Sequence, residues 1–516
     1  MKQILKKAIL ALGALVALST LVFFTGVFWP LDLPKPANTP DRILIKGAQI
    51  VDVERGVIRP DMDVLIENGQ ITAVRPNIDD QIATIIPGLG QYVVPGLFDM
   101  HMHSITLSPV LTHPLFVAAG VTAVRDMGGC LDKADPWVAC IDDKREWNRA
   151  VADNEMVGPR YDVVTGLAIN GGAEIPGGFD SVLGAATPDG ARDRVRYDQA
   201  RGIDFLKPYT RLPREGYMAL AEEAQKHGMY LAGHQPFAVS GPDLVKARQR
   251  SVEHAFFFLW ECWPGIDDLR VAGDLAQAFK VENRDRMIRE HDAARCQELR
   301  TLMVDHGTAF VPTHTTRKLD AYALDEAYRN DHRLRFIPGP LRFLWLEDAN
   351  AMARRAGEGQ QDFYMQTYHF GLEQTGAARR AGVTILAGTD APDSFAFPGS
   401  GLHDELEHLV DAGLSEAQAL RAATSDAAYF LGLEGGAGVI APGARADLVM
   451  LSANPLDNIS AVRQINTVIL AGSIYDETQL QRLKDSVEEI AGHWSMWPKF
   501  TWQMLTSPVM RRQLID

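Results

Sequence analysis

The chain has 516 residues, of which 46% are hydrophobic and 23% are charged, an ordinary composition for a globular protein. The formal net charge of −15 at pH 7 leaves no basic excess to neutralise phosphates, which excludes a nucleic acid as a partner. The length predicts one barrel domain of about 250 residues or more and a smaller second domain.

The N-terminal segment predicts a membrane anchor. Its first seven residues include three lysines, and residues 8–29 carry no charge. As a helix, this uncharged stretch would be about 33 Å long, which is enough to cross the core of a bilayer. The lysines before it predict that the body is exported, to the periplasmic or another extracytoplasmic side. A cleaved signal peptide is the alternative. Aromatic residues at the far end favour an uncleaved anchor over residues 1–30, followed by a proline-rich linker over 31–40.

Two separate segments have the short apolar runs and turn residues of β-strands. The first covers residues 41–95, where Asn68-Gly69 predicts a hairpin turn. The second covers residues 437–475, and we expect both to combine into one small, discontinuous β-sandwich domain. Residues 476–516 predict a helical extension that packs on the body or contacts the membrane surface. The expected strands are residues 43–45, 49–53, the hairpin over 64–71, 438–443, 446–451 and 467–472.

Residues 96–436 alternate short apolar runs with helical stretches such as 214–227 and 402–412. This alternation predicts an α/β fold with a TIM-type (β/α)8 barrel, whose chemistry would lie at the carboxyl ends of the strands. Helix-rich insertions over about 262–300 and 318–374 are expected to cap that mouth. The expected strands end at His103, Asp126, Thr165, Lys207, His234, His254, Thr313 and Asp390.

Residues of metal-binding types stand at several of these strand ends. His101 and His103 share one face of a strand and lie about 6.6 Å apart along it. Alone, this pair fits either a metal site or a solvated strand face. The other strand ends add two imidazoles and a carboxylate, from His234, His254 and Asp390. Together they are the ligand types that zinc or a similar divalent ion prefers.

Lys207 stands at a strand end as well, although an ammonium cation does not bind a metal. One interpretation is an ion pair with Asp390. The other is an Nζ-carbamate, formed with carbon dioxide, which would turn the cation into an anion able to bridge two ions.

These motifs occur in an order that is typical of one protein family. The chain resembles a binuclear metal-dependent hydrolase of the amidohydrolase superfamily, in its imidazolonepropionase-like and prolidase-like branch, over residues 41–472. The motifs that carry the resemblance are residues 95–103 (PGLFDMHMH), 205–207 (FLK), 232–234 (AGH), 251–254 (SVEH), 387–390 (AGTD) and 442–449 (PGARADLV).

The resemblance implies two divalent metal ions, zinc in the first instance. His101, His103 and Asp390 would hold the more buried ion, and His234 and His254 the second. Lys207, as N6-carboxylysine, would bridge both. Mononuclear deaminases of the superfamily usually carry a Glu a few residues after the histidine at position 234, whereas this chain continues with Gln-Pro-Phe.

The function implied by the resemblance is hydrolysis of an amide (C–N) bond, in a dipeptide or an N-acyl amino acid. A hydroxide that bridges the metals would attack, with Asp390 as general base and then general acid. One alternative is a lactone, ester, or cyclic amide or imidazolone substrate at the same binuclear site. Another is a metal-binding scaffold without turnover. The expected partners are a small-molecule substrate and, through the N-terminal helix, the membrane; homo-oligomers are left open.

Other residues have both a functional and a plainer interpretation. Contacts with the substrate are predicted for Tyr209, Arg211, His314 and His403, with solvated loop charges or packing histidines as the alternative. Arg125 and Asp126 predict an ion pair that braces the barrel. Of the four cysteines, Cys130 and Cys140 either form a disulfide in an oxidising compartment or remain free thiols.

Overall fold

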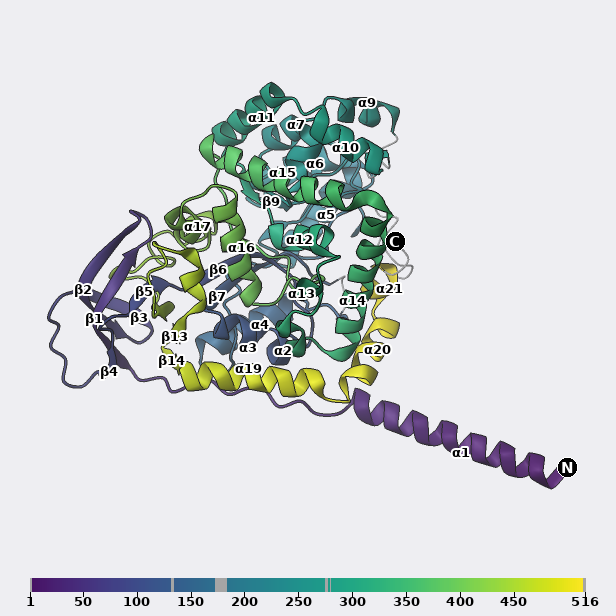
Figure 1. The fold of residues 1–516 in the computed structure, drawn as a ribbon, viewed down its shortest axis with the longest axis horizontal. Coiled ribbons are helices and arrows are strands. Elements are labelled where there is room, and N and C mark those ends of the chain that lie inside the picture. The colour runs from purple at the N-terminus through teal and green to yellow at the C-terminus, as the bar shows by residue number, and fades with distance from the viewer. Residues whose placement is uncertain (1, 131–133, 172–182, 274–276, 279, 514–516) are drawn as a thin grey trace.

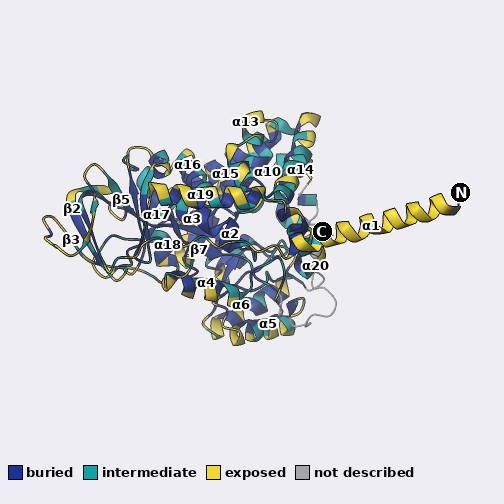
Figure 2. Cartoon of the chain, turned by 90° about the horizontal axis from the view of Figure 1, so that it is seen from below, coloured by how far each residue is buried: buried dark blue, intermediate teal, exposed yellow. Residues whose placement is uncertain are grey.

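The computed structural model places a β-sheet at one end of the molecule and a long helix at the other, with the barrel and its helices between them (Figure 1). The helix, α1, comprises Lys2–Val27 and is exposed over most of its length, with Gly26 and Val27 buried at its end (Figure 2). The structure describes residues 2–130, 134–171, 183–273, 277–278 and 280–513.

The sheet combines strands from both ends of the chain. Its order is β14-β13-β12-β5-β1-β2-β3, and β4 also pairs with β1. The N-terminal and C-terminal segments meet where β5 pairs antiparallel with β12, with Val94 opposite Val449. The strands are β1 (Arg42–Asp52), β2 (Val57–Glu67), β3 (Gln70–Arg75), β4 (Thr84–Pro87), β5 (Tyr92–Pro95), β12 (Leu448–Leu451), β13 (Ile465–Leu470) and β14 (Ser473–Asp476).

Local sequence explains most of this sheet, with two corrections. Asn68 and Gly69 have φ of 49° and 74°, the left-handed conformation that a tight hairpin turn requires. The strands expected at 43–45 and 49–53 form the single strand β1, because a register shift after Ile45 absorbs the intervening residues. The strand expected at 438–443 is wrong. That segment is irregular, and the Gly443 N–H donates to the Ile71 carbonyl of β3.

The barrel strands pair in parallel. β6 and β7 are buried at every position, as expected for parallel strands covered on both faces. The chain therefore has a TIM-barrel-type α/β fold, as the sequence predicts. The strands expected to end at Thr165 and Asp390 contribute only isolated bridges. The barrel strands are β6 (Leu97–Met102), β7 (Val121–Asp126), β8 (Phe205–Leu206), β9 (Tyr230–Gly233), β10 (Ser251–Glu253) and β11 (Ala309–Val311).

Helices surround these strands, and both predicted insertions are helical. The helices up to β11 are α2 (Ser108–Leu111), α3 (His113–Ala118), α4 (Ile141–Ala152), α5 (Pro188–Ala200), α6 (Arg214–Lys226), α7 (Gly241–Lys246), α8 (Phe256–Glu261), α9 (Gly265–Ala272), α10 (Val281–Arg289) and α11 (Ala293–His306). Those after β11 are α12 (His314–Tyr322), α13 (Glu326–Arg329), η3 (His332–Phe336), α14 (Gly339–Arg355), η4 (Ala356–Gln360), α15 (Gln361–Arg380), α16 (Ser400–Asp411), α17 (Glu416–Ala422), α18 (Ser425–Phe430) and η5 (Ile459–Arg463).

The C-terminal extension is helical, as predicted, and its second helix contacts the end of α1. The extension consists of α19 (Glu477–Gly492), α20 (Met496–Thr506) and α21 (Pro508–Gln513). Gly26 of α1 lies so close to Pro498 that an added Cβ would overlap the proline ring. The Lys499 Nζ donates to the Val27 carbonyl at 2.8 Å. By length and composition, α1 is sufficient to cross a membrane.

Two disulfides join pairs of cysteines. Cys130 pairs with Cys140, one of the two alternatives that the sequence left open, across a Cα–Cα distance of 4.9 Å. Cys262, which follows α8, pairs with Cys296 of α11 across 5.0 Å. The sequence did not indicate this second pair, because 34 positions separate its members and only the packing of the helical insertion brings them together.

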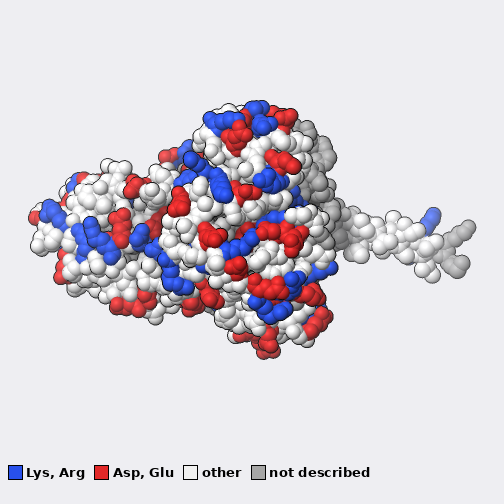
Figure 3. Space-filling view, turned by 90° about the horizontal axis from the view of Figure 1, so that it is seen from above, with Lys and Arg blue, Asp and Glu red and all other residues white. Residues whose placement is uncertain are grey.

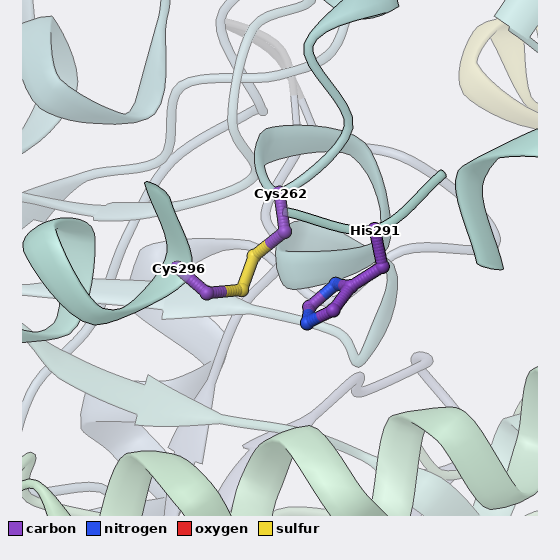
Figure 4. Close-up of side chains that lie close together, drawn as sticks. All are labelled: Cys262, His291 and Cys296. Carbon is purple, nitrogen blue, oxygen red and sulfur yellow. A yellow bond between two sulfur atoms is a disulfide. The ribbon is translucent and has the colours of Figure 1, made fainter. Parts of the chain in front are cut away.

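His291 lies beside the second disulfide (Figure 4). Its ring nitrogen and the two sulfur atoms lie within 4.8 Å of one another, a spacing that a metal ion would accept. A metal binds the thiolate form of cysteine, and here each sulfur is bonded to the other. The group therefore stabilises the insertion between α8 and α11 rather than offering a ligand set.

We expect the double substitution Cys262→Ser and Cys296→Ser to lower the free energy of unfolding by about 3–4 kcal/mol, from the entropy of the loop that the disulfide closes. Urea unfolding of the purified protein measures the loss. Removal of Cys130 and Cys140, which close a loop of only 10 positions, is the matched control and should cost about 1 kcal/mol less. Equal stability of both double variants and the unmodified protein would contradict the disulfide assignment.

Candidate metal centre

Three predicted ligands converge where β6 ends. The Asp390 backbone N–H donates to the His101 carbonyl at 2.6 Å, which places the 387–390 segment beside β6. Asp390 Oδ1 lies 3.3 Å from His101 Nε2 and 3.0 Å from His103 Nε2. One donor atom from each of the three residues falls within 4.8 Å of the others. This spacing suits coordination of a single ion.

His234 and His254 form the other half of the cluster. They follow β9 and β10, and their Nε2 atoms lie 2.9 Å apart. His254 Nδ1 also lies 3.8 Å from Asp390 Oδ2, so the two halves share one carboxylate. Burial lowers the pKa of His254 to about 3 and that of His234 well below its usual range. Both rings are therefore neutral near pH 7 and can offer a lone pair to a metal.

Backbone strain concentrates at the same place. His254, Thr313 and Asp390 have φ of 73°, 48° and 65°, in the left-handed region that residues with a Cβ rarely adopt. The Thr313 hydroxyl lies 2.8 Å from His254 Nδ1 and so fixes the ring that this backbone turn presents. Strain of this kind persists only where the surrounding structure enforces it, which is typical of functional sites.

Lys207 follows β8 and is almost completely buried. Burial lowers the pKa of its ammonium to about 8, although the carboxylate of Asp390 opposes the shift. The Nζ lies 5.6 Å from the centre of the Tyr209 ring, and that ring lies 4.1 Å from the ring of His234. Lys207 is therefore beside the histidine cluster, with an amine that loses its proton more readily than an exposed lysine does.

A buried carboxylate behind the cluster orients His101. Glu253 Oε2 accepts a hydrogen bond from His101 Nδ1 at 2.8 Å. In the neutral ring this bond keeps the proton on Nδ1, so that the lone pair of Nε2 is directed at the cluster. Arg125 and Ser251 bind the other oxygen of Glu253. Burial alone would raise the pKa of Glu253. The guanidinium of Arg125 and the hydrogen bonds from His101 and Ser251 outweigh it and lower this pKa to about 2. Glu253 is therefore an anion that holds the His101 ring in one tautomer.

The predicted ion pair between Arg125 and Asp126 is wrong. Successive side chains of β7 point to opposite faces, so neighbours in the strand cannot pair. Arg125 Nη2 contacts Glu253 at 2.9 Å, whereas Asp126 contacts Lys144 of α4 at 2.9 Å. Arg125 thus supports the cluster through Glu253.

The donors fit a divalent ion. His101 Nε2 is buried and has no hydrogen-bond partner, although a buried polar atom is normally paired. His234 and His254 direct two neutral nitrogens at each other. An ion bound between these atoms would satisfy them all.

Asp99 is a second carboxylate that sequence reasoning missed. It accepts hydrogen bonds from the Thr389 hydroxyl at 2.6 Å and from the backbone N–H groups of Thr389 and His101. It thereby joins β6 to the segment that carries Asp390. Its place two residues before His101, on the same strand face, is the sequence signal that could have identified it.

We expect Glu253→Gln to weaken metal binding by about 10- to 100-fold, because the ring of His101 would lose the anion that fixes its tautomer. Competition with a chelator of known affinity measures the loss. Glu222→Gln, on α6, replaces an exposed carboxylate that pairs with Lys226 and is the matched control. Equal metal affinity of the two variants would contradict the role given to Glu253.

Two cavities meet at the cluster. One, of about 600 Å³, is lined by aromatic side chains together with Arg211 and Arg317. The other, of about 750 Å³, includes Lys207 and Tyr209 and has a largely apolar wall from α14 and α21. The residues that line both cavities are Thr210, Arg211, His234, His254 and Asp390.

The predicted substrate contacts separate into two groups. Tyr209 and Arg211 line the cavities beside the cluster. His314 is buried at the start of α12, where its Nε2 lies 2.9 Å from the Thr375 hydroxyl. His403 is buried too, and its Nε2 lies 2.8 Å from the Ala119 carbonyl. Neither histidine lines either cavity.

Parts of this sequence are similar to known amidohydrolases. The sequence model of the amidohydrolase family matches residues 320–475. Dihydroorotase of Carboxydothermus hydrogenoformans is 40% identical over 81 residues, which are 16% of this chain and 18% of that enzyme. An uncharacterised protein of Mycobacterium tuberculosis is 28% identical over 186 residues, 36% of this chain and 41% of its own length. The chain thus spans less than half the length of these curated relatives.

Solved structures share the fold over most of the chain. Bottromycin amidohydrolase is 23% identical, with a TM-score of 0.67, and the match covers 88% of this chain and 92% of that one. A prolidase complexed with N-methylphosphonate-L-proline is 22% identical, with a TM-score of 0.58 and coverage of 84% and 99%. At these identities the likeness establishes the fold. The family match covers residues 320–475, and the likeness to these structures shows that most of the chain has the same fold.

Proposed function

We propose that the chain is a metal-dependent hydrolase of C–N bonds that acts on a dipeptide or an N-acyl amino acid. The observation that carries the proposal is the meeting of four imidazoles, one aspartate and one buried lysine, from separate strand ends, at the junction of two cavities. His101, His103 and Asp390 would hold one ion and His234 and His254 the other. Carboxylated Lys207 would bridge the two.

In the proposed reaction, the side chain of Asp390 accepts and donates the proton. Two divalent ions in the cluster would lower the pKa of a shared water and polarise the scissile carbonyl. His101, directed by Glu253, and its neighbours hold the pKa of Asp390 well below its usual range despite burial, so its carboxylate is ionised. Asp390 can therefore accept the proton of the attacking water and then donate it to the leaving amine.

The two cavities support a substrate with a group on each side of the scissile bond. In the smaller cavity, Arg317 lies over the ring of Phe256, and Phe237 and Trp260 supply further aromatic surface. A carboxylate beside an apolar side chain, as in the amino-acid half of the substrate, matches this lining. The larger cavity would take the acyl or N-terminal half.

Features outside the site fit an exported, membrane-anchored enzyme, and we include this location in the proposal. α1 has the length and composition of a membrane span. Both disulfides suit an oxidising compartment on the far side of the membrane. The lysines at the start of α1 give the matching orientation.

The test is metal content together with hydrolysis of a dipeptide and N-acyl amino acid library by the full-length protein in detergent. We expect about two divalent ions per chain and release of a free amino acid, both lost on removal of the metal with a chelator. Turnover confined to lactones, esters or ring amides would replace the proposed bond with the alternative. Absence of bound metal in active protein would contradict the mechanism.

A further inference from the structure

The larger cavity and the membrane helix lie at the same end of the molecule. In Figure 1, α14, α20 and α21 stand on the side from which α1 projects, opposite the β-sheet. Two of these helices form a wall of the cavity. Leu341, Leu344, Trp345 and the carboxylate-bearing Asp348 come from α14, and Val509 and Met510 come from α21.

One helix, α20, separates this wall from α1. Met496 and Phe500 on one side of α20 are buried in a core cluster with Ile105 and Trp137, which line the cavity. Pro498 and Trp502, on the opposite side, meet α1 at Gly26 and at the ring of Phe24. The apolar lining of the cavity is therefore continuous, through one layer of side chains, with the end of the candidate membrane span.

Large exposed aromatic residues gather at this end. Among the described residues, the exposed phenylalanine and tryptophan side chains all lie in or just after α1, in α14, or in or just before α20, whereas the exposed Tyr429 lies in α18. Trp29 and Trp494 are in contact, with ring centres 5.7 Å apart, and the indole of Trp497 lies against Gly339 at the start of α14. The exposed residues are Phe24, Phe28, Trp29, Phe343, Trp494 and Trp497.

Exposed aromatic residues around a candidate span are typical of a surface that rests on the headgroup layer of a bilayer. Phe343 is 56% exposed, while Leu344, its neighbour in α14, lines the cavity. Elsewhere, on the face seen in Figure 3, acidic and basic side chains are interspersed. The partner that fits the aromatic surface is therefore a lipid bilayer.

We propose that the larger cavity receives the apolar chain of an amphiphilic amide, such as a long-chain N-acyl amino acid, that enters directly from the bilayer. The proposal rests on the proposed function and narrows its substrate class. The apolar chain would lie between α14 and α21, the scissile carbonyl at the metal cluster, and the carboxylate in the smaller cavity beside Arg211 and Arg317.

The first experiment measures kcat/KM of the full-length metal-loaded protein for N-acetyl-, N-octanoyl- and N-dodecanoyl-L-phenylalanine. Each additional buried CH₂ group should raise kcat/KM by about two- to fourfold until the cavity is filled. Leu344→Glu places a charge in the cavity wall and should lower the value for the dodecanoyl substrate at least about tenfold more than that for the acetyl substrate. Leu89→Glu, at an exposed position of the sheet domain, is the matched control.

Equal kcat/KM for the three substrates, or equal losses for all of them in Leu344→Glu, would overturn the proposal while leaving the proposed function intact. Calorimetry of N-dodecanoyl-L-phenylalanine binding to the metal-loaded protein identifies the opposite case, in which the cavity assignment holds but the proposed function fails. Tight binding that Leu344→Glu abolishes, without any turnover, would support the cavity assignment and refute the hydrolase.

The second experiment tests the bilayer as the source. N-hexadecanoyl-L-phenylalanine is placed either in the same phosphatidylcholine vesicles as the protein or in separate vesicles. Entry from the bilayer predicts initial rates at least about tenfold higher in shared vesicles. Equal rates would show that the substrate arrives through water and would overturn this part of the proposal.

Discussion

Replacement of Asp390 by asparagine is expected to lower kcat by about 10²- to 10⁴-fold, the range that a general acid or base contributes. Asparagine has nearly the same shape as aspartate. The backbone N–H of residue 390 would still donate to the His101 carbonyl, so the fold around β6 should survive. The amide, however, cannot accept a proton from an attacking water. Kinetics with the best substrate of the library, together with metal analysis of the same sample, measure the effect.

Metal analysis separates the two contributions of Asp390. In the proposed centre this side chain is both a ligand, 3.3 and 3.0 Å from the Nε2 atoms of two histidines, and a proton acceptor. A variant that keeps both ions but loses turnover would identify the proton transfer as the larger contribution. Asp411→Asn, at an exposed position at the end of α16, is the matched control. Near-normal kcat in metal-loaded Asp390→Asn would exclude Asp390 as the base.

The convergence of the candidate ligands could be predicted because it depends on strand ends. Parallel strands of a barrel bring their carboxyl ends to one mouth, whatever lies between them in the sequence. His101, His234 and His254 follow this rule and meet in the structure. The rule does not predict the positions of residues in helices. His314 of α12 and His403 of α16 are buried and line neither of the two cavities at the cluster.

The residues that orient the candidate ligands could not be predicted from the sequence. Glu253 stands next to His254 within a recognised motif, but its partners Arg125 and His101 lie more than 100 positions away. Only the folded arrangement of the strands shows that a carboxylate on β10 faces a histidine on β6. The disulfide between Cys262 and Cys296 has the same origin, since it depends on how α8 and α11 pack.

Two of the expected barrel strands, those ending at Thr165 and Asp390, do not form regular strands because their backbone is irregular. The segments that precede Thr165 and Asp390 carry the apolar runs of strands, yet they contribute isolated bridges alone. Near Asp390 the chain turns with a φ of 65° to direct the carboxylate at the histidines. The local preference for strand is overridden where the site requires a strained backbone.

The substitution Lys207→Ala is expected to remove bridged metal and to lower kcat at least about 100-fold. If a carbamate on Lys207 bridges two ions, a short carboxylic acid such as acetate or propionate can occupy the space left by the side chain and supply the missing anion. Activity should therefore return in part when millimolar carboxylate is added with excess metal. Lys226→Ala, on the exposed face of α6, is the matched control and should neither lose metal nor respond to carboxylate.

The substitution Lys207→Arg distinguishes the two interpretations of this residue. An ion pair with Asp390 needs only a positive charge, which arginine keeps, whereas a carbamate needs an amine that can lose its proton. The lysine is buried beside the histidine cluster, where its pKa is lowered to about 8, so the neutral amine is accessible near pH 8. An arginine variant as inactive as the alanine variant would support the carbamate. An arginine variant with full activity and full metal content would assign Lys207 to charge balance, and the two ions would then share only Asp390 and water.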